Sequence, residues 1–140
     1  MITITLAGRP LGKQRVRFTK EHQRPFTPQK TVHYEARLAH EAQHEMAGRP
    51  LLAGPLLVRI EIRVPIPESK SKKWKTQALA GSILPTKKPD VDNVSKFIDA
   101  LNLVCWHDDA QICDLNVRKL YHMAPALIIT IEEIATGIFA

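Results

Sequence analysis

The chain has 140 residues, of which 44% are hydrophobic and 24% charged, and its formal net charge at pH 7 is +6. These values are typical of one folded domain over residues 1–140 and exclude a disordered chain. The N-terminal residues lack the basic region and the apolar run of a signal peptide, so none is expected, and no apolar run approaches the ~18 residues that a membrane span needs. The only cysteines, Cys105 and Cys113, lack the spacing of a zinc site or disulfide framework, so a cytoplasmic protein with reduced thiols is expected.

The first half of the chain predicts two strands that flank a loop and a helix. Residues 2–6 alternate isoleucine with threonine, which is the period of a half-buried strand. Residues 9–30 are polar and rich in Arg, Lys and Pro, which indicates a loop. Residues 31–47 predict a helix that Gly48 ends, and residues 56–64 alternate again as a second strand.

Two of these elements also predict which side chains are buried. The weak apolar face expected for the helix is Val32, Ala36, Ala39, Ala42 or Gln43, and Met46. In the second strand, Arg59, Glu61 and Arg63 alternate with aliphatic residues, so we expect them to face away from the core.

The second half of the chain predicts two helices and then two strands. Residues 69–79 favour a short helix with Ser69 or Ser71 as its cap, and residues 92–104 carry apolar side chains at spacings of three and four. Residues 111–121 and 126–133 read as strands, and we expect them to form an antiparallel hairpin. The predicted fold class is α/β (α+β), with a mixed sheet and two to three helices.

Acidic residues are concentrated in the second half of the chain. Residues 1–88 carry 17 Lys and Arg against 6 Glu and no Asp, whereas residues 89–140 carry 3 against 8 acids. All six aspartates lie within 25 residues. An acidic cluster in an otherwise basic chain suits a metal-dependent enzyme that acts on a phosphate backbone, because carboxylates hold Mg²⁺ and basic side chains hold the polyanion.

Asp90 and Asp92 are the first candidate ligands. Pro89 favours an extended chain before them, and in an extended segment residues two apart point to the same side. Two carboxylates can then reach one ion. The competing interpretation is that one of them caps the helix that follows.

Asp108 and Asp109 are the natural source of a third ligand, since they follow directly after that helix. Neighbouring strand positions point to opposite faces, so one of the two is expected to face the metal. An ordinary polar turn is the alternative. Lys96 lies between the two pairs and would contact the scissile phosphate, or else balance the acids through an ion pair. Asp99 is assigned as the partner of Lys96 rather than as a ligand.

Three segments resemble the RusA family of Holliday-junction resolvases, which are common in prophages. They run Lys88-Pro89-Asp90-Val91-Asp92-Asn93-Val94-Ser95-Lys96, Asp99-Ala100-Leu101-Asn102 and Trp106-His107-Asp108-Asp109-Ala110-Gln111. The N-terminal run Lys13-Gln14-Arg15-Val16-Arg17 is also similar to the opening of family members. The matches span most of residues 8–115.

The resemblance implies a RusA-like fold and a Mg²⁺-dependent homodimeric endonuclease of DNA recombination and repair that resolves four-way junctions by paired nicks. It implies that Asp90, Asp92 and Asp109 bind the metal and that Lys96 is needed for cleavage. Asp108 remains the rival of Asp109.

Basic residues outside this cluster are candidate DNA contacts. They are Lys13, Arg15, Arg17, Lys72, Lys73 and Lys88, and the aromatic Trp74 is a further candidate. Trp74 stands within a run of lysines, where it would either stack on a base or anchor a solvated helix. Two alternative functions stay open, a different structure-selective nuclease that acts on flaps or forks, and a DNA-binding module without catalysis.

Overall fold

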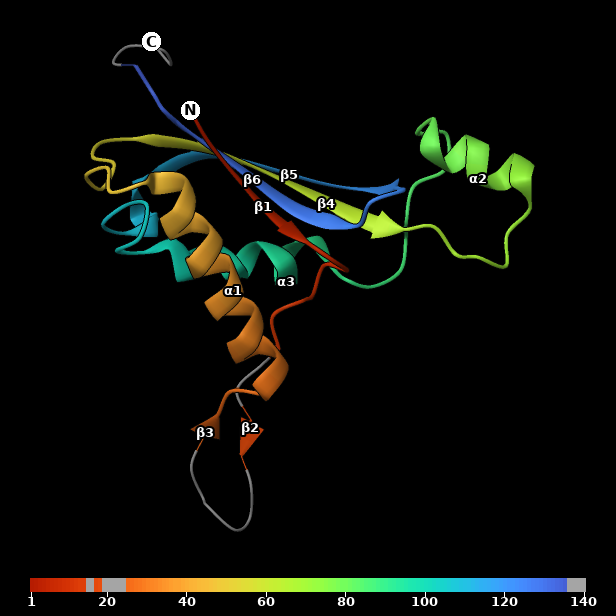
Figure 1. The fold of residues 1–140 in the computed structure, drawn as a ribbon, viewed down its shortest axis with the longest axis horizontal. Coiled ribbons are helices and arrows are strands. Elements are labelled where there is room, and N and C mark those ends of the chain that lie inside the picture. Colours follow the sequence, from red (N-terminus) through yellow and green to blue (C-terminus); the bar gives the residue numbers. More distant parts are fainter. Residues whose placement is uncertain (15–16, 19–24, 136–140) are drawn as a thin grey trace.

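The computed structural model describes residues 1–14, 17–18 and 25–135, except for the side chains at 17 and 18 (Figure 1). The helical elements are α1 (Gln29–Met46), α2 (Lys72–Leu79), α3 (Val91–Ser95) and the 3₁₀ segments η1 (Lys96–Leu101) and η2 (Asp109–Gln111). The strands are β1 (Ile2–Ala7), β2 (Arg17–Phe18), β3 (Pro25–Phe26), β4 (Leu56–Pro65), β5 (Ile112–His122) and β6 (Ala126–Glu133). The predicted α+β class is confirmed.

Within the described residues, four strands form one mixed sheet in the order β1-β6-β4-β5. β6 is antiparallel to both β1 and β4, and β5 is parallel to β4. The predicted hairpin between residues 111–121 and 126–133 is therefore wrong, because β4 lies between β5 and β6. Because β4 pairs with β5 on one edge and with β6 on the other, it lies in the interior of the sheet, and its Val58 and Ile62 are fully buried.

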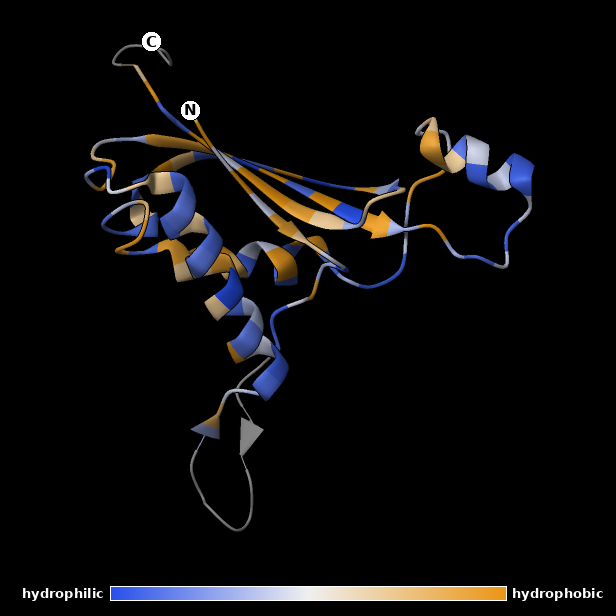
Figure 2. Cartoon of the chain, in the orientation of Figure 1, coloured by the Kyte–Doolittle hydropathy of each residue, from blue (hydrophilic) through white to orange (hydrophobic). Residues whose placement is uncertain are grey.

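Helices cover one face of this sheet, which we call the covered face. α1 and α3 lie below the strands in Figure 1, and α1 packs against β1 and η1. The core between them is closed by the fully buried Phe97, Leu101 and Trp106. Figure 2 shows hydrophobic residues concentrated in the strands, whereas the outer side of α1 is largely hydrophilic.

The buried face of α1 differs from the predicted one. The residues that it buries are Thr31, Tyr34, Leu38, Ala42 and Met46. Val32 is 45% exposed, and Ala36 is exposed as well, so the prediction was wrong at these two positions. Hydropathy assigned little weight to Thr31 and Tyr34, but the Tyr34 ring packs on Phe97 with ring centroids 4.7 Å apart.

The helix predicted over residues 92–104 is shorter than expected. α3 ends at Ser95, and the chain continues as the 3₁₀ segment η1 to Leu101. Val94, Phe97 and Leu101 are buried along this path. The apolar spacing therefore predicted the buried residues correctly, but not the change from α-helix to 3₁₀ helix. The segment ends where Asn102 becomes extended, and its side chain accepts a hydrogen bond of 2.6 Å from the Trp106 indole.

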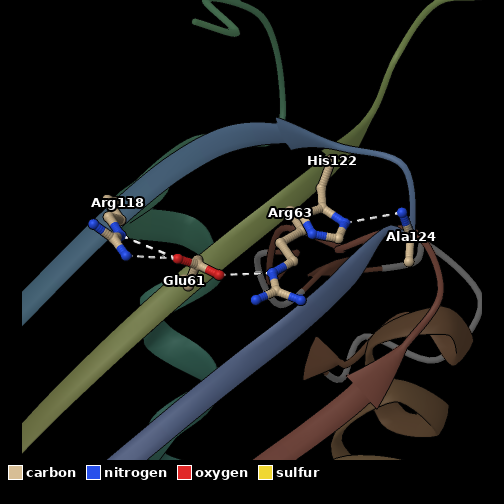
Figure 3. A network of polar contacts seen from close by, with 5 residues as sticks. All are labelled: Glu61, Arg63, Arg118, His122 and Ala124. Atoms are coloured by element: carbon tan, nitrogen blue, oxygen red, sulfur yellow. Dashed lines mark hydrogen bonds and ion pairs between the residues drawn. The ribbon is translucent and has the colours of Figure 1, made fainter. Parts of the chain in front are cut away.

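The other face of the sheet, the open face, carries no described helix (Figure 1). Arg59, Glu61 and Arg63 point to it, as predicted. Glu61 accepts from Arg63 at 2.6 Å and from Arg118 at 2.8 Å (Figure 3). Burial acts to raise the pKa of Glu61, but the hydrogen bonds from the two guanidinium groups outweigh it and lower that pKa.

α2 stands beyond the strand ends, apart from the other helices (Figure 1). Ser71 caps it by accepting from the Trp74 backbone N–H at 3.2 Å, which confirms one of the two predicted caps. The Trp74 ring meets Tyr121 of β5 edge-on at 5.3 Å between centroids, which ties the helix to the sheet. None of the helices among the described residues has the length and apolar character that a bilayer span requires.

Candidate metal-binding site

Asp90 stands at the junction between the loop from residue 80 and α3. Its backbone is extended, with φ −76° and ψ 141°, and its carbonyl accepts the first helical hydrogen bond from Val94 at 3.1 Å. Its carboxylate makes no capping bond to the backbone of α3. The capping interpretation of Asp90 therefore lacks its defining hydrogen bond, and the exposed carboxylate remains available to a ligand.

Asp92, Lys96 and Asp109 come from three successive elements and line one hollow of about 360 Å³. Asp92 is in the first turn of α3, Lys96 begins η1 and Asp109 begins η2. Asp92 and Lys96 also line a neighbouring hollow of about 690 Å³, together with Asp90 and Lys88. The fold thus brings both predicted acidic pairs and the predicted lysine to one continuous region of the surface.

Asp108 and Asp109, the two candidates for the third metal ligand, have different hydrogen-bond partners. Asp108 accepts a hydrogen bond from the Ala110 backbone N–H at 3.1 Å and caps η2. Gln111 completes a capping box by accepting from the backbone N–H of Asp108 at 3.1 Å. Asp109 has no such backbone role and faces the 360 Å³ hollow instead.

The two neighbouring carboxyl groups also titrate differently. The hydrogen bond from Ala110 lowers the pKa of Asp108, and its contact with Asp109 acts in the same direction. The pKa of Asp109 is raised, first by its hydrogen bond with Asp108 and further by partial burial and the charges of Asp108 and Asp99. Crowded carboxylates of this kind are stabilised by a cation, whose charge offsets their mutual repulsion.

Lys13 forms the ion pair that we had predicted for Lys96. Its Nζ lies 2.7 Å from the Asp99 carboxylate and 3.1 Å from Glu35 of α1. Asp99 is thus a structural partner, but of Lys13, and the predicted Lys96–Asp99 pair does not form. Lys96 instead donates to the side chain of Asn93 at 3.2 Å. The N-terminal segment reaches the site because the Lys13 backbone N–H donates to the Asn93 carbonyl at 2.9 Å.

The donor chemistry fits Mg²⁺, which prefers oxygen ligands and is usually bound by one or two carboxylates with waters and substrate phosphates. Asp92 and Asp109 supply two carboxylates to the same hollow, with Asp90 on the adjoining one. Among the described residues, no group of three His, Cys, Asp or Glu side chains is gathered closely enough to hold an ion on its own. The residues present thus suit an ion that is shared with a phosphate.

The predicted DNA-contact residues are spread over separate parts of the surface. Lys13 and Lys88 line the 690 Å³ hollow beside Asp90. Lys72 and Lys73 are exposed on α2, which stands apart from the other helices (Figure 1). Arg15 lies outside the described residues, and so does the side chain of Arg17.

Trp74 has two packing partners for its ring. Tyr121 meets it edge-on, and the Lys70 Nζ lies over the ring at 5.1 Å from the centroid. These contacts favour the anchoring role that was weighed for Trp74, whereas its role as a stacking platform for a base stays a prediction.

Two residues that support the site were not singled out from the sequence. Gln111 donates to the carbonyls of Leu52 and Gly54 at 3.0 and 3.1 Å, which ties η2 to the loop before β4. The spacing of Asp108 and Gln111 is that of a capping box and could have indicated its role. Lys119 of β5 donates to the loop before Asp90, and no local sequence signal links these distant segments.

Comparison with known proteins gives one family match and a curated relative. A family model described as "Endodeoxyribonuclease RusA" matches residues 7–132. The chain is also 37% identical over 132 residues to the uncharacterized protein YqaN of Bacillus subtilis strain 168, an alignment that covers 91% of this chain and 89% of that protein. The matched span contains every residue of the candidate site.

Proposed function

The chain belongs to the RusA endodeoxyribonuclease family, and on this premise we propose that it resolves four-way DNA junctions by Mg²⁺-dependent hydrolysis of phosphodiester bonds. The observation that carries the proposal is the shared hollow of Asp92, Lys96 and Asp109. It offers carboxylates and an ammonium group at one exposed place, as phosphate chemistry with a divalent ion requires.

Asp90, Asp92 and Asp109 are the residues that would hold Mg²⁺. When bound, Mg²⁺ supplies charge neutralisation at the phosphate and lowers the pKa of a water at the reaction centre. Asp109 is preferred to Asp108 because the Asp108 carboxylate is occupied as the cap of η2. For Asp90, metal binding is preferred to helix capping because its carboxylate makes no hydrogen bond to the backbone of α3.

Lys96 has the role of a phosphate contact. Its Nζ is held by the neutral side chain of Asn93 and not by a carboxylate, so its charge is not cancelled by an ion pair. An ammonium group placed beside the metal ligands stabilises the negative charge that develops on the phosphate during cleavage. Lys13 is held differently, between Asp99 and Glu35, and serves to orient the N-terminal segment at the site.

Two copies of the chain are needed for paired nicks, because each cut requires its own set of carboxylates. We therefore propose a homodimer that places two sites on the two strands of opposite polarity. Sedimentation of the purified protein tests this, and a monomer at the concentrations that give paired cleavage would contradict it.

Cleavage of a synthetic four-way junction in Mg²⁺ tests the proposed function. Symmetric paired nicks are expected from the wild type and a loss of at least about 100-fold from Asp92→Asn, since even outer partners of metal ligands change activity about 10- to 100-fold. Asp114→Asn is the matched control, because Asp114 lies on the open face of β5 and contacts Asn116. Cleavage of flaps but not junctions would favour a different structure-selective nuclease. Junction binding with no cleavage by any variant would leave a DNA-binding module.

A further inference from the structure

Lys119 of β5 contacts the segment that carries the first two acids. Its side chain leaves the strand on the covered face, in register with the buried Ile62 of β4. Its Nζ donates to the carbonyl oxygen of Lys87 at 2.6 Å and to that of Pro89 at 3.0 Å. We propose that Lys119 is a positioning residue, which sets the backbone before Asp90 so that Asp90 and Asp92 can bind the metal. The inference rests on the proposed function.

The segment that Lys119 holds has few other polar contacts. In the described part of the chain, no backbone-to-backbone hydrogen bond involves residues 83–89. Among the described residues, Lys119 is also the only side chain that forms hydrogen bonds with residues 83–89. An ammonium group suits this task, because its three donors reach two carbonyls at once and charged donors form the stronger hydrogen bonds.

The segment is fixed again directly after the acids. The Lys13 backbone N–H donates to the Asn93 carbonyl at 2.9 Å. A side chain at Gly12 would meet Asn93 at 3.4 Å, so the N-terminal segment already lies in close contact there. Residues 90–92 are thus held between Lys119 on one side and the N-terminal segment on the other. Loss of the Lys119 bonds would free the first of these two attachments.

A positioning role and a charge-only role predict opposite effects on metal affinity. A lysine near the acids repels a divalent cation, so removal of its charge alone would strengthen metal binding. If Lys119 instead sets the backbone of the ligand segment, its removal weakens metal binding. Outer residues that orient metal ligands typically change affinity about 10- to 100-fold.

Binding of Mn²⁺ to the full-length protein, followed by electron paramagnetic resonance and calorimetry, tests the inference without relying on cleavage. Lys119→Met is expected to weaken Mn²⁺ binding about tenfold or more, and Lys119→Arg to recover most of the loss because it restores charged donors. Arg118→Met is the matched control, since it removes the same charge from the adjacent residue on the open face. It should bind Mn²⁺ within about twofold of the wild type, because exposed charges act weakly at a distance in salt.

Mn²⁺ binding by Lys119→Met that equals or exceeds wild-type binding would overturn the positioning role and leave the proposed nuclease function standing. A wild-type protein that neither binds Mn²⁺ nor cuts junctions would overturn both. Thermal unfolding of each variant shows whether it is folded at the temperature of the titration. If Lys119→Met is unfolded, Lys119→Gln replaces it under the same two criteria, because its shorter side chain cannot span both carbonyls.

Discussion

The adjacent carboxylates of Asp108 and Asp109 show how local hydrogen bonds assign different roles to identical residues. Asp108 accepts from the Ala110 N–H and caps η2, whereas Asp109 faces the hollow that contains Asp92 and Lys96. The same contact between the two carboxyl groups lowers the pKa of Asp108 and raises that of Asp109. One member of the pair stabilises the turn, and the other is left for chemistry.

The pair provides a matched test of this assignment. Asp109→Asn is expected to reduce junction cleavage about 100-fold or more, because a ligand should matter at least as much as an outer partner. Asp108→Asn should keep cleavage within about threefold, because asparagine is as good an N-cap as aspartate. Initial rates on the junction at saturating Mg²⁺ decide between them. If the two effects were reversed, Asp108 would be the ligand.

At single residues, the sequence predicted local features but not contacts between distant segments. The i, i+2 spacing of Asp90 and Asp92 was interpreted as an extended pair, but only Asp90 is extended, whereas Asp92 lies in the first turn of α3. The partner predicted for Asp99 was wrong because its actual partner, Lys13, lies 86 positions away. Lys119 was missed because it contacts Lys87 only when β5 is in the sheet. Sequence distance carries no information about such contacts until the topology is known.

At the scale of elements, α2 is a basic helix that stands apart from the sheet and is attached to β5 through Trp74 and Tyr121. Its Lys72 and Lys73 are exposed and have no ion-pair partner within the described residues. We propose that this helix contacts a DNA arm that leaves the proposed cleavage site.

Replacement of both lysines by alanine tests that role. Two lost phosphate contacts should reduce the slope of log affinity against log salt by about 2 units at most. Arg49→Ala with Arg59→Ala removes the same charge from exposed positions elsewhere and should leave the slope unchanged. A salt titration of junction binding in Ca²⁺, monitored by fluorescence anisotropy, gives both slopes. Equal slopes in the two double variants would exclude α2 from the DNA interface.

Element boundaries were predicted well where hydrophobic period and caps agreed, as for β4 and α2. The break between α3 and η1 was not predicted, because the buried Val94, Phe97 and Leu101 are separated by three and four positions. Over so few residues, that spacing fits both an α-helix and a 3₁₀ turn. For α1, the period was correct but the face was shifted, because Tyr34 is buried by its contact with Phe97.

At the scale of the whole molecule, the sheet separates two chemical environments. The acids and lysines of the candidate site lie with the helices, whereas Glu61 lies on the open face between Arg63 and Arg118 (Figure 3). The position of β4 between β5 and β6 was not predictable from short-range patterns, since consecutive strands usually pair. The link from β5 to β6 is a short loop past β4, in which the Ala124 N–H donates to the His122 ring at 2.9 Å.

The Glu61 ion pairs make the stability of the fold depend on pH. The folded protein lowers the pKa of Glu61, so this stabilisation is complete above the unfolded pKa and is lost as the pH falls through the folded one. Glu61→Gln should lower the free energy of unfolding by about 1 kcal/mol at pH 7, as for a partly exposed ion pair. That difference should vanish in acid, where the wild-type carboxyl is also neutral. Urea unfolding at a series of pH values measures it.

Glu132→Gln is the control for this experiment. Glu132 lies on the same open face and makes no ion pair among the described residues. Its replacement should change the free energy of unfolding by less than about 0.5 kcal/mol at any pH. A pH-independent loss in Glu61→Gln would mean that packing, and not charge, accounts for its effect.

The parallel pairing of β4 with β5 has a consequence for the nascent chain. Residues 66–111 form the crossover between these strands, and every proposed metal ligand lies within it. The ribosome has therefore made all of these acids before it makes β5, and the loop before Asp90 is held by Lys119 only after β5 has joined the sheet. Closing such a long loop is a late and slow event in folding. In a partly synthesised chain the proposed metal ligands thus lack their final arrangement, which they reach together with completion of the sheet.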